Sequence, residues 1–300
     1  MKKLTALIIA YFAATGAYAC DICGGGLGNS YNGLLPNFNK RFVGVRYHFN
    51  QLYTQLDIHG NITALSNKEK YHTAEIWSAW NIHPKWRVMA IIPYSKIFKY
   101  NYGTTSEINK SGLGDINVST YYNLLNTSNN SNHNVWLGIG VKLPTGEYRK
   151  EDLDTNSPNI YQLGTGSLDL IASASYDIRV DNMGLNTNLS YKWNTENSEK
   201  YRYGNKTTLN ASLYYLHAFS EKSNIRPHAG IQYEYQTKDR TLGYILDQTG
   251  GYNLNLNVGA EATIHKLAVG VFYQSPLQQN ISNHRTELIQ KVGMHVTFTF

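Results

Sequence analysis

The chain has 300 residues and a formal net charge of +6, but only 16% of its residues are charged, against roughly 25% in soluble globular proteins. Aromatic residues make up 13%, and most of them are tyrosines. The negative mean hydropathy excludes a bundle of membrane-spanning helices, and the absence of a basic run gives nucleic-acid binding little support.

The N-terminus has the three parts of a secretory signal peptide. Lys2 and Lys3 form a positive start, an apolar run follows to Ala14, and Ala17-Tyr18-Ala19 matches a small-residue cleavage site. An uncleaved helical anchor is the alternative, but it needs about 20 apolar residues, and this run is shorter. The sequence therefore predicts a cleaved signal peptide over residues 1–19.

The mature chain then begins with a cysteine pair, Cys20 and Cys23, followed by three glycines. Gly24 stands where a haem attachment motif needs histidine. In an oxidising compartment the pair favours a disulfide or redox role first, then a thiophilic metal such as Cu(I) or Zn, then lipidation of Cys20. We interpret residues 20–38 as a periplasmic N-terminal segment and expect no resident cofactor.

From residue 39 to residue 300 the dominant hydrophobic period is two. Leu185, Thr187, Leu189, Tyr191 and Trp193, for example, alternate with polar residues. Strict alternation predicts strands with one apolar and one polar face. Twelve segments share the pattern, most of them as long as tilted membrane strands: 40–50, 72–82, 86–95, 112–125, 134–143, 166–179, 184–194, 206–219, 224–236, 251–264, 266–274 and 290–300.

The two faces of these strands differ in charge. The apolar phase holds no lysine, arginine, aspartate or glutamate, whereas the other phase is rich in asparagine, serine, threonine and glycine. A soluble sandwich would show the same alternation, but its polar face would carry many lysines and glutamates. The pattern instead predicts an all-β transmembrane, antiparallel up-and-down barrel of about twelve strands over residues 39–300. Eleven charged residues fall on the inward phase and are the candidate pore-lining residues: Arg46, Glu75, Arg87, Asp115, Lys142, Asp169, Asp177, Lys192, Arg226, Glu234 and Glu261.

The connections alternate between long and short, as in bacterial outer-membrane barrels. The long ones are expected at 51–71, 96–111, 144–165, 195–205, 237–250 and 275–289. If Phe300 lies at the periplasmic edge, every long loop is external and both termini are periplasmic. Aromatic residues near strand ends fit two interfacial girdles, with ordinary strand propensity of aromatics as the alternative: Tyr47, Trp80, Trp86, Tyr191, Trp193, Tyr233, Tyr235 and Tyr273.

The last strand alternates apolar residues up to Phe298 and Phe300. This ending is similar to the C-terminal signal that the outer-membrane assembly machinery reads. The expected location is the bacterial outer membrane, and the expected partners are outer-membrane lipid, the assembly machinery and a small solute, with no nucleic acid.

Four short motifs go beyond generic barrel features: Ile92-Pro93-Tyr94, Gly112-Leu113-Gly114-Asp115, Leu143-Pro144-Thr145-Gly146 and the run from Gly164 to Asp169. In this order they resemble the outer-membrane transporter family named for the meta-pathway of phenol degradation, over residues 76–180. The resemblance implies a barrel that admits small, apolar or aromatic molecules and has no catalytic residue. From the residues themselves, Asp115 and Asp169 are expected at the rim, where they bind arginines or cap loop amides.

Three functions compete. A pore or transporter for small solutes agrees best with the polar inward phase. A structural or surface-recognition barrel is the second hypothesis, in which the loops, asparagine-rich and without repeats, carry the function. A lipid-acting enzyme is the third, and it needs a nucleophile and a base on the lipid-facing side. There His217 is the only histidine that the pattern places on the apolar phase, with no evident serine partner, so we expect no enzyme. The near balance of inward charges disfavours a strong ion filter of one sign.

Overall fold

The computed structural model describes residues 41–128, 132–153 and 158–300. The predicted signal peptide (1–19), the segment 20–38 with Cys20 and Cys23, and the first two residues of the predicted barrel lie outside these ranges. Within them, no helix is long and apolar enough to cross a membrane.

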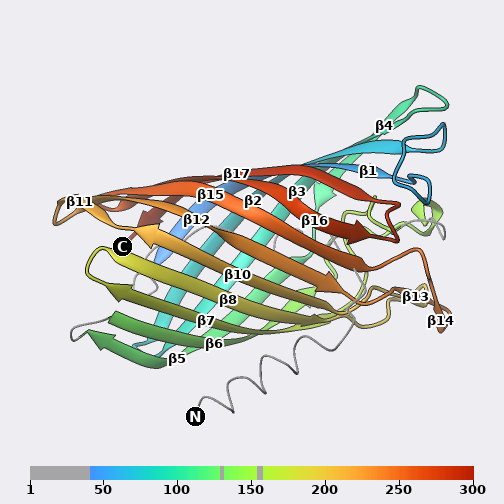
Figure 1. The fold of residues 1–300 in the computed structure, drawn as a ribbon. Coiled ribbons are helices and arrows are strands. Elements are labelled where there is room, and N and C mark those ends of the chain that lie inside the picture. Colours follow the sequence, from blue (N-terminus) through green and yellow to red (C-terminus); the bar gives the residue numbers. More distant parts are fainter. Residues whose placement is uncertain (1–40, 129–131, 154–157) are drawn as a thin grey trace, which may run out of the picture.

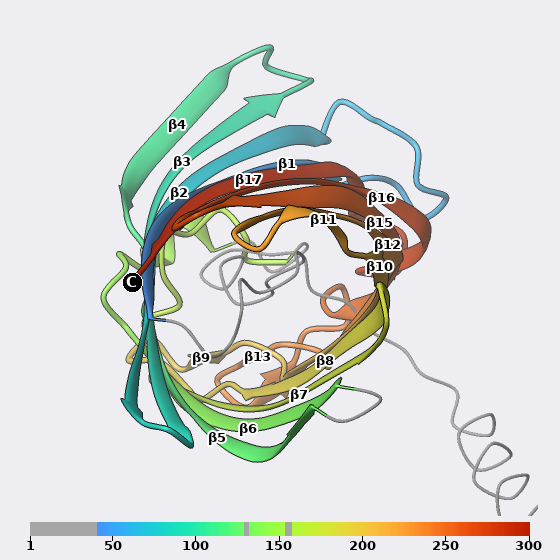
Figure 2. The same cartoon turned by 90° about the vertical axis from the view of Figure 1, so that its left-hand side faces the viewer.

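Antiparallel strands close into one barrel (Figures 1 and 2). Its main sheet has 14 elements. β4 and β5 are consecutive pieces that both pair with β3, and β10 and β11 both pair with β12, so the described residues form twelve barrel strands. The elements are β1 (Phe42–Thr54), β2 (Asn67–His83), β3 (Trp86–Asn101), β4 (Glu107–Leu113), β5 (Ile116–Ser128), β6 (Asn132–Leu143), β7 (Asp169–Val180), β8 (Met183–Trp193), β10 (Lys206–Tyr215), β11 (His217–Ser220), β12 (Ser223–Gln236), β15 (Gly251–Ile264), β16 (Leu267–Ile281) and β17 (Glu287–Thr299).

The two faces of the barrel wall carry the expected residue types. In β1, Val43 and Val45 are exposed, whereas Arg46 and His48 on the other phase are buried. Ile139, Val258 and Val271 on other strands are also exposed. An exterior of exposed aliphatic side chains around a polar interior is the arrangement that a lipid bilayer stabilises. The predicted fold class is therefore confirmed.

The connections gather by length at the two ends of the barrel. We call the end with residues 84–85, 181–182, 221–222 and 265–266 the short-turn end, and Phe300 lies there (Figure 1). The long-loop end holds connections 55–66, 102–106, 144–168, 194–205, 237–250 and 282–286. A second, small sheet stands at the long-loop end and consists of β9 (Tyr201–Arg202), β13 (Arg240–Thr241) and β14 (Tyr244–Ile245).

Several strands extend further toward the long-loop end than the sequence pattern indicates. β2 starts at Asn67, so the connection expected at 51–71 is shorter, and the same holds for 96–111 and 275–289. Lys68 and Lys70 interrupt the apolar phase because this part of the wall stands beyond the apolar belt, while backbone pairing with β1 continues. The extension also leaves Tyr47 and Tyr273 near the middle of their strands instead of at a girdle.

Candidate functional site

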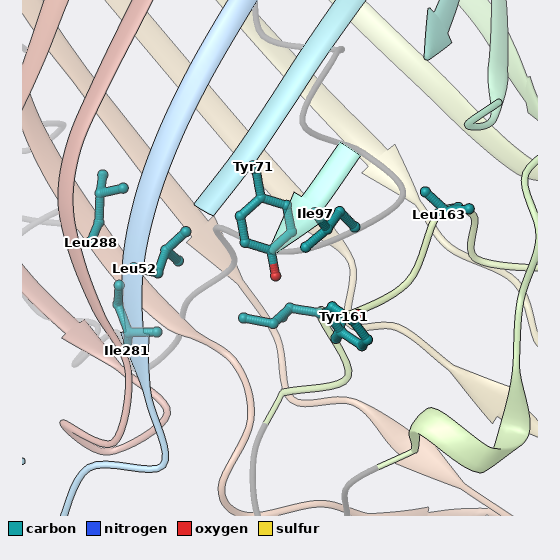
Figure 3. Packing of buried hydrophobic residues seen from close by; sticks show 8 residues of the cluster. Leu52, Tyr71, Ile97, Tyr161, Leu163, Ile281 and Leu288 are labelled. Carbon is teal, nitrogen blue, oxygen red and sulfur yellow. The ribbon is translucent and has the colours of Figure 1, made fainter. Parts of the chain in front are cut away.

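The mouth of the barrel at the long-loop end is narrowed by a part of the 144–168 connection. Residues 158–165, here called the inward segment, are all buried. Within it, the side chains of Ile160, Tyr161 and Leu163 are 2%, 6% and 5% exposed. They pack with buried residues of the wall into one apolar group, the mouth cluster (Figure 3): Leu52, Tyr71, Ile97, Ile160, Tyr161, Leu163, Ile281 and Leu288. An irregular loop thus brings apolar side chains against the inner wall of β1, β2, β3, β16 and β17.

Polar contacts hold the inward segment from two sides. On the β4 side, the Lys110 ammonium donates to the Tyr161 carbonyl and lies 4.1 Å from the centre of the Tyr161 ring. On the β9 side, the Tyr203 hydroxyl donates to the Asn159 carbonyl at 3.0 Å. The Asn197 amide donates to the Thr165 carbonyl, also at 3.0 Å. Burial raises the pKa of Tyr161 to about 12.

Three buried charges, here called the base clamp, fix the two ends of the 144–168 connection. The Lys142 Nζ atom lies 2.8 Å from Asp115 Oδ2 and 2.7 Å from Asp169 Oδ2, and all three side chains are fully buried. Asp115 also accepts hydrogen bonds from the backbone amides of Gly146 and Thr165. The cation is Lys142 and not an arginine, but the carboxylates do cap loop amides as expected.

Three of the four motifs quoted for the family resemblance converge on this clamp. Gly112–Asp115 precedes β5, the Leu143–Gly146 motif ends β6, and the run from Gly164 to Asp169 leads into β7. Gly146 and Gly164 approach each other so closely that a Cβ atom on Gly164 would lie 2.4 Å from the Gly146 carbonyl oxygen. Because glycine has no Cβ atom, Gly146 and Gly164 allow the two ends of the connection to pass close to each other beside the base clamp.

A row of inward residues, here called the charged row, crosses six strands of the wall below the mouth. Strand register places Arg226, Glu261, Gly270, His295, Arg46 and Glu75 next to one another in that order, from β12 to β2. Arg46 pairs with Glu75, and Arg226 pairs with Glu261. The Nε2 atom of His48 lies 3.3 Å from the Glu75 carboxylate, and that of His295 lies 3.5 Å from Glu261. Each buried carboxylate of the row thus has an arginine and a histidine beside it.

The other candidate residues lie apart from these two groups. Glu234 pairs with Lys206 at 3.3 Å, Asp177 accepts hydrogen bonds from Asn186 and Tyr214, and the Arg87 guanidinium lies 5.2 Å from the Phe42 ring centre. Lys192 is 8% exposed. The candidate set omits further inward charges. Among them are Lys206 and Lys291, which share the inward phase of expected strands, Glu69, which lies in the extension of β2, and Lys99, whose ammonium lies 5.4 Å from the centre of the Tyr161 ring.

Large inward rings lie against glycines of the neighbouring strand. His295 faces Gly270 directly across β17 and β16, and a Cβ atom on Gly270 would come within 2.3 Å of the imidazole. Phe272 faces Gly293 in the same way. Four more such pairs are Trp77 with Gly44, Tyr121 with Gly138, Tyr214 with Gly184 and His228 with Gly259. Because glycine has no side chain, each ring has room to lie over the backbone of the neighbouring strand.

The histidines on the outer face lie beside aromatic residues. His217 packs against the rings of Tyr215 and Phe219. His217 is not, as the sequence pattern predicts, the only histidine on the apolar phase, because His72 and His133 also alternate with inward residues and share that phase. Their Nδ1 atoms lie 2.7 and 2.9 Å from the hydroxyls of Tyr47 and Tyr176, respectively. Within the described residues, no group of three histidine, cysteine or acidic side chains could hold a metal.

Comparison with known proteins places this geometry in context. The family model described as "Putative MetA-pathway of phenol degradation" matches residues 49–275. A solved outer membrane channel from Pseudomonas putida F1 superimposes with a TM-score of 0.66 at 11% identity, covering 89% of this chain and 100% of that one. The transport unit of the autotransporter AIDA-I from Escherichia coli gives 0.49 at 13% identity, covering 91% and 95%. No curated protein sequence matches the chain. The first structure shows that the barrel fold is shared.

Proposed function

Because the chain belongs to the family described as "Putative MetA-pathway of phenol degradation", we propose that it is an outer-membrane pore or transporter for small solutes of apolar or aromatic character. Family membership confirms the resemblance that the four motifs indicated. The proposal assigns the barrel no catalytic residue.

The mouth cluster is the observation that carries the proposal. A water-filled diffusion pore needs polar side chains at its narrowest part, as in barrels with aqueous channels. Here Ile160, Tyr161 and Leu163 of the inward segment pack against Leu52 and Leu288 of the wall, so apolar contacts close this part of the mouth. An apolar or aromatic solute that passes this mouth exchanges apolar contacts between protein side chains for apolar contacts with itself. A strongly hydrated solute must lose bound water there, which costs free energy.

Below the mouth, the solute meets a different chemistry. The charged row holds its carboxylates in pairs with arginine and histidine, so it presents neither a strong positive nor a strong negative field. Asparagine and glutamine side chains such as Asn255, Asn257 and Gln232 fill the neighbouring inward positions. This arrangement supports a pore that selects solutes by their apolar character at the mouth and not by their charge in the lumen.

Solute influx into proteoliposomes tests the proposal. Two anions that lipid bilayers exclude, benzenesulfonate and the smaller methanesulfonate, are compared by stopped-flow swelling. We expect benzenesulfonate to enter faster by roughly fivefold, the factor that about 1 kcal/mol of aromatic contact provides. Faster entry of methanesulfonate, as size alone dictates, contradicts the proposal.

A variant with Ile160→Asn and Tyr161→Asn is expected to lose the aromatic preference, since it makes the mouth polar. The matched control is Leu242→Asn with Tyr244→Asn, because these side chains are 69% and 77% exposed and lie in another loop. The control is expected to keep the preference of the unmodified barrel.

The C-terminal residues agree with the proposed location. Phe298 and Phe300 are half exposed on the outer face, with ring centres 6.4 Å apart, and Phe300 contacts the ring of Trp80. We propose that the outer-membrane assembly machinery reads these residues as the end of the barrel, and the orientation with both termini in the periplasm belongs to the same proposal.

A further inference from the structure

A hollow of about 460 Å3 opens at the rim of the long-loop end, between the small sheet and the ends of β10 and β12. The residues that matter for its chemistry are Arg202, Asn205, Tyr235, Lys238, Arg240 and Ile245. We call it the rim pocket. It shares no residue with the mouth cluster or the base clamp.

The rim pocket faces the outside of the barrel. The Asn205 amide donates to the Tyr191 hydroxyl at 3.0 Å, and Tyr191 is exposed on the outer face of β8. Tyr235 lies on the outer phase of β12, since Glu234 and Gln236 on the other phase are buried. The opposite face of the small sheet turns inward. There Tyr201 is buried and its hydroxyl donates to Asp239 at 2.5 Å.

Two arginines meet in the rim pocket without an acidic partner. Arg202 and Arg240 are directly paired across β9 and β13, so their side chains share one face of the small sheet. Like charges in this position destabilise a sheet. The nearby acidic groups pair with lysines, Glu196 with Lys200 and Asp247 with Lys238 of the pocket itself. Arg202 donates from its Nε atom to the Asn194 carbonyl at 3.0 Å. Among the described residues, neither arginine forms an ion pair, and an anion bound between them would remove the repulsion.

The position of the pocket identifies the anion. Tyr191, Tyr233, Tyr235 and Tyr252 lie on the outer phase near the same end of their strands, and such aromatic girdles mark the level of the lipid headgroups. Arginine binds phosphate with two parallel hydrogen bonds, and basic pockets on membrane proteins bind anionic headgroups. We propose that the rim pocket binds a phosphate group of lipopolysaccharide in the outer leaflet, an assignment that rests on the outer-membrane location and on the proposed orientation, with the long-loop end facing outward.

Binding measurements on the refolded barrel in detergent micelles test this inference. The probes are purified lipopolysaccharide, the same lipid after removal of its phosphates, and inorganic phosphate. We expect the affinity for lipopolysaccharide to fall roughly thirtyfold when its phosphates are removed, and by the same factor in the Arg202→Gln, Arg240→Gln double variant, since each basic residue near an anionic lipid surface contributes about 1 kcal/mol. Inorganic phosphate at millimolar concentration is expected to compete poorly, because it lacks the acyl chains.

The matched control removes two positive charges from the other end of the barrel, with Lys85→Gln and Lys222→Gln, both in exposed short turns. It is expected to bind as tightly as the unmodified protein. Equal affinity for lipopolysaccharide with and without its phosphates overturns the proposal, and this comparison needs only the unmodified protein, so it holds even if the double variant fails to fold. If inorganic phosphate competes with an affinity equal to that of lipopolysaccharide, the occupant of the pocket is not a lipid. Solute influx is expected to be unchanged in the double variant, which separates this inference from the proposed function.

Discussion

Replacing Lys142 by methionine is expected to destabilise the mouth of the barrel by about 3–5 kcal/mol, the usual consequence of removing one partner from a buried ion pair. The substitution leaves Asp115 and Asp169 fully buried beside each other without their shared cation. Their mutual repulsion should release the 144–168 connection from the wall. We therefore expect protease cleavage within this connection in the folded variant and a larger single-channel conductance.

A triple variant controls for the loss of packing. Asp115→Asn and Asp169→Asn, added to Lys142→Met, remove all three charges while conserving side-chain volume. Replacing a whole buried ion group by neutral residues of similar size is often close to neutral. The triple variant should regain protease resistance. If the single variant is as resistant as the unmodified barrel, the base clamp does not hold the loop.

The substitution Leu189→Arg is expected to reduce the free energy of unfolding in lipid vesicles by about 2–4 kcal/mol, the range for a cation on the lipid face near the bilayer midplane. Leu189 is 47% exposed in the middle of β8. The matched control is Asn188→Arg, whose side chain points to the opposite face because strand residues alternate. Urea titration of both variants should give a loss for Leu189→Arg only, and equal losses would contradict the assignment of the outer face to lipid.

Much of the barrel could be predicted because the bilayer imposes one rule on every strand. The alternation from Leu185 to Trp193 placed β8 within one residue of its bounds. The rule fails where the wall leaves the apolar belt, and there it predicts a loop for Lys68 and Glu69, which lie in β2. Strand pairing continues at that level because backbone hydrogen bonds do not depend on the side chains.

The site was predicted less completely. Asp115, Lys142 and Asp169 were all placed on the inward phase, but their contact depends on the register of three strands and the path of the loop, which period two does not specify. The inward segment left only a weak signal, the apolar residues Ile160, Tyr161 and Leu163 within an irregular connection. Nothing local distinguishes such a run from one that faces solvent, since its burial depends on Leu52, Tyr71 and other distant wall residues.

Single-channel recording in planar bilayers shows whether the inward segment sets the width of a pore. The unmodified barrel is compared with a variant in which Ile160, Tyr161 and Leu163 are all replaced by serine, each shown to be folded by its heat-modifiable migration in gels. We expect small, resolved conductance steps from the unmodified barrel and clearly larger steps from the serine variant, because the mouth cluster loses the side chains that the segment contributes. Steps of equal size from the two folded proteins, or none from either, would mean that the inward segment does not set the width of a pore.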